Sequence, residues 1–156
     1  MSCEKFIGNL FLARDVTHSV HLNTRSYAKH KALNKFYVSI IELADDFAEA
    51  YQGKYGLIGP IELQSAKKTN NVVEFLEDMV KTIMDSRYDV VEKECTPLQN
   101  IIDEILALFY STLYKLRQNL IDVIVIYLNS KVDLDADFLD LPVEIVDERL
   151  GHGHIG

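Results

Sequence analysis

Four side chains of metal-ligating type lie in the first third of the sequence: His21, His30, Asp45 and Glu49. Imidazole nitrogen and carboxylate oxygen are ligands that iron accepts, and a mixed set of them leaves coordination positions open for an oxidant. If one long helix carries the last three, a rise of 1.5 Å per residue places His30 roughly 22 Å from Asp45, whereas Asp45 and Glu49 are neighbours one turn apart. One chain therefore cannot bring His30 to the two carboxylates.

The helix that has to position these residues is predicted from Ser26 to Gly53. At 100° per residue it divides into an apolar face, a solvated face and a mixed stripe between them. The apolar face comprises Leu33, Phe36, Ile40, Leu43, Ala44, Phe47 and Tyr51, and the mixed stripe comprises His30, Asn34, Tyr37, Val38, Ile41, Asp45, Ala48 and Glu49. A second copy packed antiparallel on the mixed stripe would bring His30 of one subunit towards Asp45 and Glu49 of the other. A metal site of this kind forms only in a two-fold dimer.

This pattern resembles the Dps-like branch of the ferritin-like proteins. The resemblance is carried by His21 with Asn23, then His30, Leu33, Phe36, Asp45, Glu49 and Gly53. It implies a four-helix bundle assembled into a hollow shell, with a ferroxidase centre for iron that takes His21 and His30 from one subunit and Asp45 and Glu49 from its neighbour. The sequence departs from that pattern at Asn34, where a further acidic ligand is usual, and in a shorter interval between the two histidines. An amide oxygen is a poorer iron ligand than a carboxylate.

Three further helices are expected around this one. The first covers residues 4 to 22, the third runs from a cap at Thr69 or Asn70 to about Val91, and the fourth opens at Thr96 and Pro97. The fourth has an apolar seam of Leu98, Ile102, Ile105, Phe109, Leu113, Leu116 and Leu120. The stretch after Gly53 is rich in turn residues and fits a long crossover. We therefore predict an all-α, ferritin-like four-helix bundle over residues 1–120, with a long crossover between its second and third helices.

Residues 121–156 form a C-terminal extension for which the pattern leaves two structures open. The runs IDVIVIYL and VEIVDERL are rich in β-branched residues. They fit either two strands or a helical continuation followed by an extended arm. The aspartates between them, which include Asp133 and Asp135, lack the glycine and final glutamate of a calcium loop, so a solvated acidic linker is expected. The arm is the candidate contact for a protein partner.

Composition excludes several classes of function. The net charge is −8, and an acidic surface repels phosphate backbones, so direct nucleic-acid binding is not expected. The two cysteines, Cys3 and Cys95, are too few for a disulfide framework and suit a reducing compartment. No signal-peptide pattern is present, and the longest apolar run, Ile121 to Leu128, contains Asp122 and is too short to cross a bilayer. We expect a cytoplasmic protein, or part of a particle assembled there, without membrane contact.

Two functions fit these observations. The first is a Dps-like protein that oxidises and sequesters Fe(II) at the inter-subunit site and protects against peroxide. The second is a non-catalytic helical bundle, of the kind that tailed phages encode, with a structural or interaction role and no iron chemistry. Asn34, the short interval and the added arm favour the second function. No Glu-x-x-His motif occurs, which argues against a di-iron site inside one bundle. Asp15, His18 and His21, one turn apart, are a further candidate ligand set, and His152 and His154 suit a flexible tail.

Overall fold

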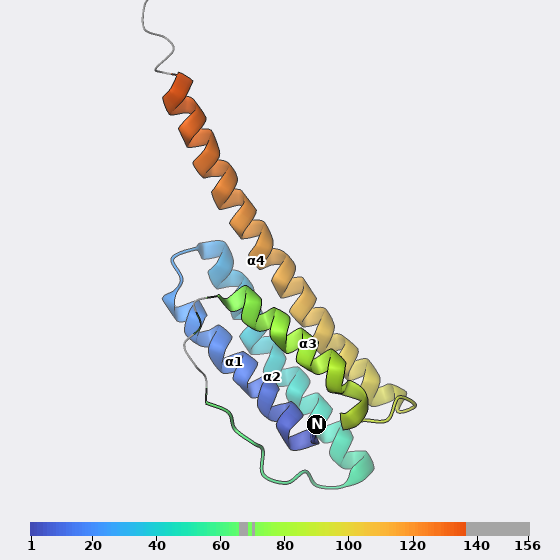
Figure 1. The fold of residues 1–156 in the computed structure, drawn as a ribbon. Coiled ribbons are helices and arrows are strands. Elements are labelled where there is room, and N and C mark those ends of the chain that lie inside the picture. Colours follow the sequence, from blue (N-terminus) through green and yellow to red (C-terminus); the bar gives the residue numbers. More distant parts are fainter. Residues whose placement is uncertain (66–68, 70, 137–156) are drawn as a thin grey trace, which may run out of the picture. The chain divides into compact units, whose positions relative to one another are not determined.

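The structure, a computed structural model, describes residues 1–65, 69 and 71–136 of the 156-residue chain. Every regular element in this part of the chain is a helix, and no strand occurs there. The predicted all-α fold class is therefore confirmed for the described residues. The helices, coloured in chain order in Figure 1, are α1 (Cys3–Asn23), α2 (Tyr27–Tyr55), α3 (Val72–Val90) and α4 (Thr96–Ala136).

The chain divides into two compact units, Met1–Asn119 and Leu120–Gly156. The first unit contains α1, α2, α3 and the N-terminal part of α4. The second unit begins within α4, and its described part is the remainder of that helix.

The first three helices each begin at a polar capping residue. Ser2, Ser26 and Asn71 accept a hydrogen bond from the backbone N–H three residues further on, which satisfies one of the free donors at a helix start. The cap of α3 lies later than the predicted position at Thr69 or Asn70. The hydroxyl of Thr69 instead accepts from the N–H of Asn71 at 3.2 Å, so it forms the turn that precedes the helix.

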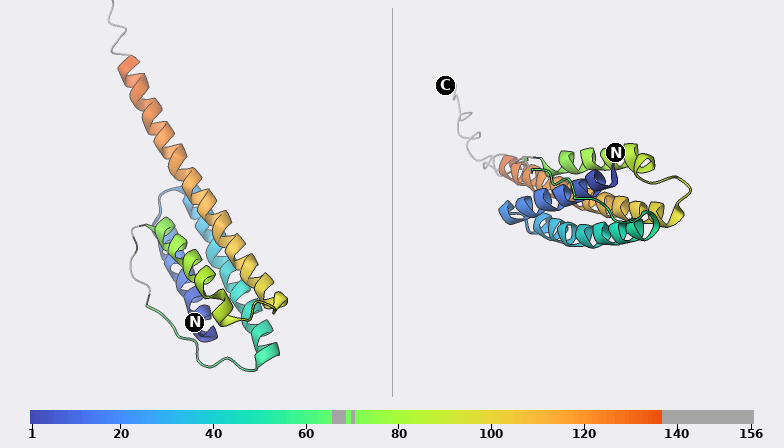
Figure 2. Two further views of the ribbon diagram at one scale, coloured as in Figure 1. Left: turned by 45° about the vertical axis from the view of Figure 1, so that its right-hand side comes forward. Right: turned by 90° about the horizontal axis from the view of Figure 1, so that it is seen from below.

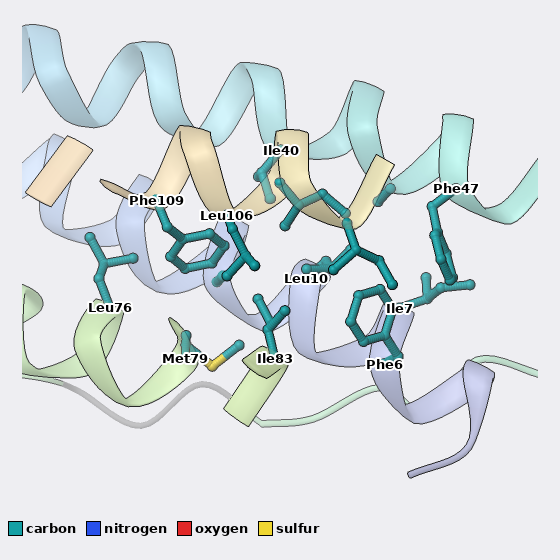
Figure 3. Close-up of a cluster of buried hydrophobic side chains, with 14 of the residues drawn as sticks. Phe6, Ile7, Leu10, Ile40, Phe47, Leu76, Met79, Ile83, Leu106 and Phe109 are labelled. Atoms are coloured by element: carbon teal, nitrogen blue, oxygen red, sulfur yellow. The ribbon is translucent and has the colours of Figure 1, made fainter. Parts of the chain in front are cut away.

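The apolar faces of all four helices meet in one interior within the first unit (Figure 3). Its largest members are Phe6, Phe36, Phe47 and Phe109, each 0% exposed. The rings of Phe6 and Phe47, and those of Phe36 and Phe109, have centroids 4.8 Å apart. The predicted faces supply this interior: α2 contributes Leu33, Phe36, Ile40, Ala44 and Phe47, and α4 contributes Leu98, Ile102, Ile105, Phe109, Leu113 and Leu116. Periodicity alone therefore identified the buried side of both helices.

The direction of the helices within the first unit requires a long connection. Helices α1 and α2 run antiparallel, α3 runs in the same direction as α2, and α4 runs back (Figures 1 and 2). Because α3 begins at the opposite end of the unit from the end of α2, the chain between them has to travel the length of the unit. Residues 56–65 of this connection, here called the crossover strap, lie along α1.

The crossover strap touches α1 at a glycine. A β-carbon added to Gly8 would lie 2.2 Å from the carbonyl oxygen of Glu62, so only glycine allows the two backbones to approach this closely. Next to this contact, the Gln64 side-chain amide donates to Asn9 Oδ1 at 2.5 Å. Ile58 and Ile61 of the strap pack against the shared interior. The strap is therefore part of the packed structure rather than a loose linker.

The run IDVIVIYL is helical, so the alternative that made it a strand is wrong. It belongs to α4, which continues to Ala136. Once the preceding turns exist, each further helical residue adds a backbone hydrogen bond, and this gain exceeds the modest β preference of valine and isoleucine. Asp133 and Asp135 are also helical, which corrects the expectation of a linker at these two positions. The run VEIVDERL and His152 and His154 lie outside the described residues. Over the described helices, none combines the length and apolarity needed to cross a membrane.

The contact at Gly8 yields a stability prediction. Gly8→Ala is expected to destabilise the protein by roughly 1–3 kcal/mol, because the new methyl group displaces the strap backbone. Gly53→Ala is the matched control: Gly53 also lies in a helix, but an added β-carbon there meets no atom within 4 Å. That control should gain up to about 1 kcal/mol from helix propensity. Urea unfolding followed by far-ultraviolet circular dichroism measures both changes, and equal stabilities for the two variants would contradict the packed strap.

Candidate functional site

The structure brings His21 and His30 together where α1 ends and α2 begins. His21 is buried, His30 is half-buried, and their rings are stacked with centroids 3.7 Å apart. Nδ1 of His21 lies 3.0 Å from the carbonyl oxygen of His30, and Nδ1 of His30 lies 3.3 Å from that of His21. Because a carbonyl oxygen only accepts, each Nδ1 carries the proton in these bonds. In the neutral ring, Nε2 then keeps its lone pair, through which it can bind a metal.

Aromatic contacts surround this histidine pair. The His18 ring stacks on the Tyr37 ring with centroids 4.2 Å apart. The rings of His21 and Tyr37 are T-shaped to each other, with centroids 5.1 Å apart. The Tyr37 hydroxyl donates to Asn34 Oδ1 at 2.9 Å, so the residue that departs from the Dps-like pattern orients this tyrosine. Asp15 pairs with Arg14 at 3.0 Å. Because His18 stacks on Tyr37 and Asp15 pairs with Arg14, the structure does not bring Asp15, His18 and His21 together as a ligand set.

The two predicted acidic ligands lie elsewhere on α2. Asp45 and Glu49 are both exposed. Over the described part of the chain, no three side chains of histidine, cysteine, aspartate or glutamate converge as a metal site would need. Asp45 instead borders an open groove of about 280 Å³, lined also by Ile7, Phe11, Ala48, Gln52, Ile58, Gly59 and Ile61. A site that joins Asp45 and Glu49 to His30 thus requires a second copy of the chain, and it stays a prediction.

A buried polar cluster joins the end of α3 to the start of α4. The Arg87 guanidinium donates to Gln99 Oε1 at 2.8 Å and pairs with Asp103 at the same distance. The Gln99 amide donates in turn to the carbonyl oxygen of Val91, the residue that ends α3, at 2.9 Å. Each buried group has a partner, as the low dielectric of an interior demands. This cluster stabilises the turn between the helices.

A second group of polar side chains gathers where α2 ends, beside the turn between α3 and α4. The Tyr55 hydroxyl donates to the Glu92 carboxylate, and Lys54 Nζ lies 3.7 Å from the same carboxylate. The Lys54 ammonium, which hydrogen-bonds the Cys95 thiol, lowers the pKa of Cys95. Opposite charge favours the thiolate, which is the reactive form of cysteine. The sequence predicted no role for Cys95 beyond a fit to a reducing compartment, because nothing in the spacing of these residues indicates that they meet.

Cys3 has the opposite environment. Burial, followed by the nearby charge of Glu4, raises the pKa of this thiol to about 12. Cys3 and Cys95 are 6% and 7% exposed, so reagents have similar access to both. The two free thiols therefore differ in pKa more than in exposure.

Comparison with known proteins places the chain among uncharacterised relatives. A family model described as a family of unknown function (DUF5856) matches residues 21–116, a range that contains all four predicted metal ligands. An uncharacterized 14.6 kDa protein from the mobD-ri intergenic region of Enterobacteria phage T4 is 30% identical over 115 residues, which cover 72% of this chain and 86% of that protein. No solved structure matches the chain. Neither match is to a Dps or ferritin protein, so the predicted membership of that family gains no support.

The contrast between the thiols predicts different rates of alkylation. At pH 8, iodoacetamide should modify Cys95 more than about tenfold faster than Cys3, because a larger fraction of Cys95 is thiolate. Lys54→Met removes the ammonium and should slow the reaction of Cys95 while leaving that of Cys3 unchanged. Peptide mass spectrometry over a time course gives both rates in one sample. Equal rates in the wild type would show that Lys54 does not act on the thiol.

Proposed function

The chain belongs to the DUF5856 family of unknown function, and from this membership we propose that it is a non-catalytic, phage-related helical protein with a structural or interaction role. A relative in phage T4 supports the phage relationship. The protein would act in the cytoplasm or in a particle assembled there.

The packed interior of the first unit is the observation that carries this proposal. Ferritin-like enzymes of the di-iron type place acidic and histidine ligands between their helices. Here the corresponding space is filled by side chains such as Phe6, Ile40, Phe47, Leu106 and Phe109 (Figure 3). An interior packed with aliphatic and aromatic groups offers neither ligands nor room for a substrate. The surface is then what this protein presents to other molecules.

The course of the chain supports a ferritin-like scaffold as the finer description of the fold. Two antiparallel pairs, α1 with α2 and α3 with α4, are joined by a connection that spans the unit (Figure 2). One long crossover between two such pairs is the connectivity of ferritin-like bundles. Scaffold and activity are separable, because function resides in the side chains that a fold carries.

The exposed residues of the mixed stripe of α2 support pairing with a second copy through a two-fold axis. Val38 on this stripe is 48% exposed, and Asp45 and Glu49 are exposed further along the helix. An antiparallel copy would place the imidazole of His30 opposite these carboxylates, which complements their charge. The midpoint between residues 30 and 45 falls at Tyr37 and Val38. Two copies of Val38 therefore lie next to the axis in this arrangement.

Pairing through α2 predicts a disulfide between copies of Val38→Cys. Mild oxidation of the full chain should give a covalent dimer on non-reducing electrophoresis, because cysteines beside a two-fold axis reach bonding distance. Lys35→Cys is the matched control, because Lys35 lies on the solvated side of the same helix. Both variants keep the two native cysteines. A failure of Val38→Cys to cross-link, or equal cross-linking by the control, would exclude this axis.

The histidine pair favours a second candidate function, a Dps-like ferroxidase that acts on Fe(II). His21 and His30 come together in one chain with both Nδ1 atoms engaged by carbonyl oxygens, a common arrangement behind metal-binding histidines. A cavity of about 250 Å³, lined by Thr24, Arg25, Ser26 and Tyr27, adjoins His30. The partner's copies of Asp45 and Glu49 would complete the ligand set. Bound iron would supply the electrons that reduce peroxide.

Iron chemistry is tested by anaerobic titration with Fe(II), followed by peroxide, while ferric absorbance is recorded. In this second function, the wild type oxidises iron in a fixed ratio to protein, and His30→Ala and Asp45→Ala each lose that phase. The non-catalytic function instead predicts a wild-type response equal to the buffer blank in a protein that cross-links at Val38→Cys. The two experiments together separate pairing from iron chemistry.

A further inference from the structure

Exposed apolar side chains gather within residues 121–128 of α4, in the described part of the second unit, and this stretch is here called the α4 block. Six large apolar side chains in it are between 47% and 68% exposed. Monomeric soluble proteins seldom leave such a contiguous set open to water. The six are Ile121 50%, Ile124 51%, Val125 47%, Ile126 68%, Tyr127 60% and Leu128 55%.

These side chains point to more than one side of the helix. At 100° per residue, positions 121, 124, 125 and 128 fall within one sector of roughly 100°. Positions 126 and 127 lie more than about 90° from the middle of that sector. One neighbouring helix covers a single stripe of this width, whereas a helix that is apolar on several sides is covered by several neighbours. The α4 block therefore needs at least two helices against it.

The exposed area is sufficient for specific association. Half-exposed to two-thirds-exposed side chains of this size each present on the order of 100 Å², or roughly 600 Å² for the six together. Two copies in contact would bury about 1,200 Å² in total, which is the lower end of the range for specific protein interfaces. A third copy raises the buried area per chain further. Association between copies alone thus reaches the size that a stable interface needs.

We infer that the α4 block joins at least three copies of this chain into a helical assembly. Every copy brings the same aliphatic surface, and closed symmetric assemblies are the usual outcome for identical chains. Polar residues follow the block directly at Asn129, Ser130 and Lys131, and the polar run of residues 117–119 precedes it with Leu120 in between. This limits the association to a short length of helix. The block lies outside residues 21–116, which the family model matches, whereas the stripe of α2 lies inside them.

Sedimentation velocity on the full-length protein tests this assembly. The wild type should sediment as three or more chains, and Ile124→Glu or Leu128→Glu should reduce it to two chains or one, because a buried carboxylate opposes association. Leu57→Glu is the matched control: Leu57 is 93% exposed in the crossover strap, so the same change there should leave the assembly intact. Far-ultraviolet circular dichroism should show the same helix content in all four proteins.

Three results would overturn the inference. A wild type that contains no more than two chains excludes an assembly of three. Unchanged assembly in both glutamate variants of the α4 block places the contact elsewhere on the chain. A monomeric wild type that floats with phosphatidylcholine vesicles would assign the block to a lipid surface. The Val38→Cys cross-link reports on α2 independently, so failure of one interface does not imply failure of the other.

Discussion

The close approach of the crossover strap to α1 at Gly8 is the contact on which the arrangement of the first unit depends. Because α2 and α3 run in the same direction, the chain has to return along the unit between them, and it does so against α1. The backbone of Glu62 reaches α1 only because position 8 has no side chain. This lets Ile58 and Ile61 cover the shared interior. Because the strap returns the chain to the end of the unit where α2 begins, α3 runs in the same direction as α2 and can bury its apolar face.

Apolar side chains fill most of the interior of the first unit, so its polar and titratable groups lie mainly at helix ends and on outer faces. The histidine pair lies at the turn between α1 and α2, and the pair of Lys54 and Cys95 lies where α2 ends. Buried Arg87 joins α3 to α4 through its hydrogen bond to Gln99. Such a distribution suits a protein that acts through contacts with other chains.

Several features of the site followed from residue pattern, and others did not. The 3.6-residue period of α2 correctly separated Phe36 and Ile40, which are buried, from Asp45 and Glu49, which are exposed. Helix geometry also correctly kept the carboxylates away from His30 in one chain. The ring stacking between His21 and His30 depends on the angle of a short turn, which no periodicity encodes. The effect of Lys54 on Cys95 depends on which helix ends meet, and distant residues carry no local sign of that.

The sequence by itself determined the helices and their buried faces, because capping and periodicity are local properties that each segment carries. Local pattern was wrong about the start of α3, which begins at the Asn71 cap, and it left strand and helix open for the β-branched residues of the α4 block. These residues continue a helix because elongation outweighs a weak strand preference. Only the tertiary structure decided that Gly8 faces the strap, that the two histidines stack and that two cysteines of equal exposure differ in pKa. The physical reason is that close contacts and electrostatic environments arise from pairs of distant residues, and packing chooses those pairs.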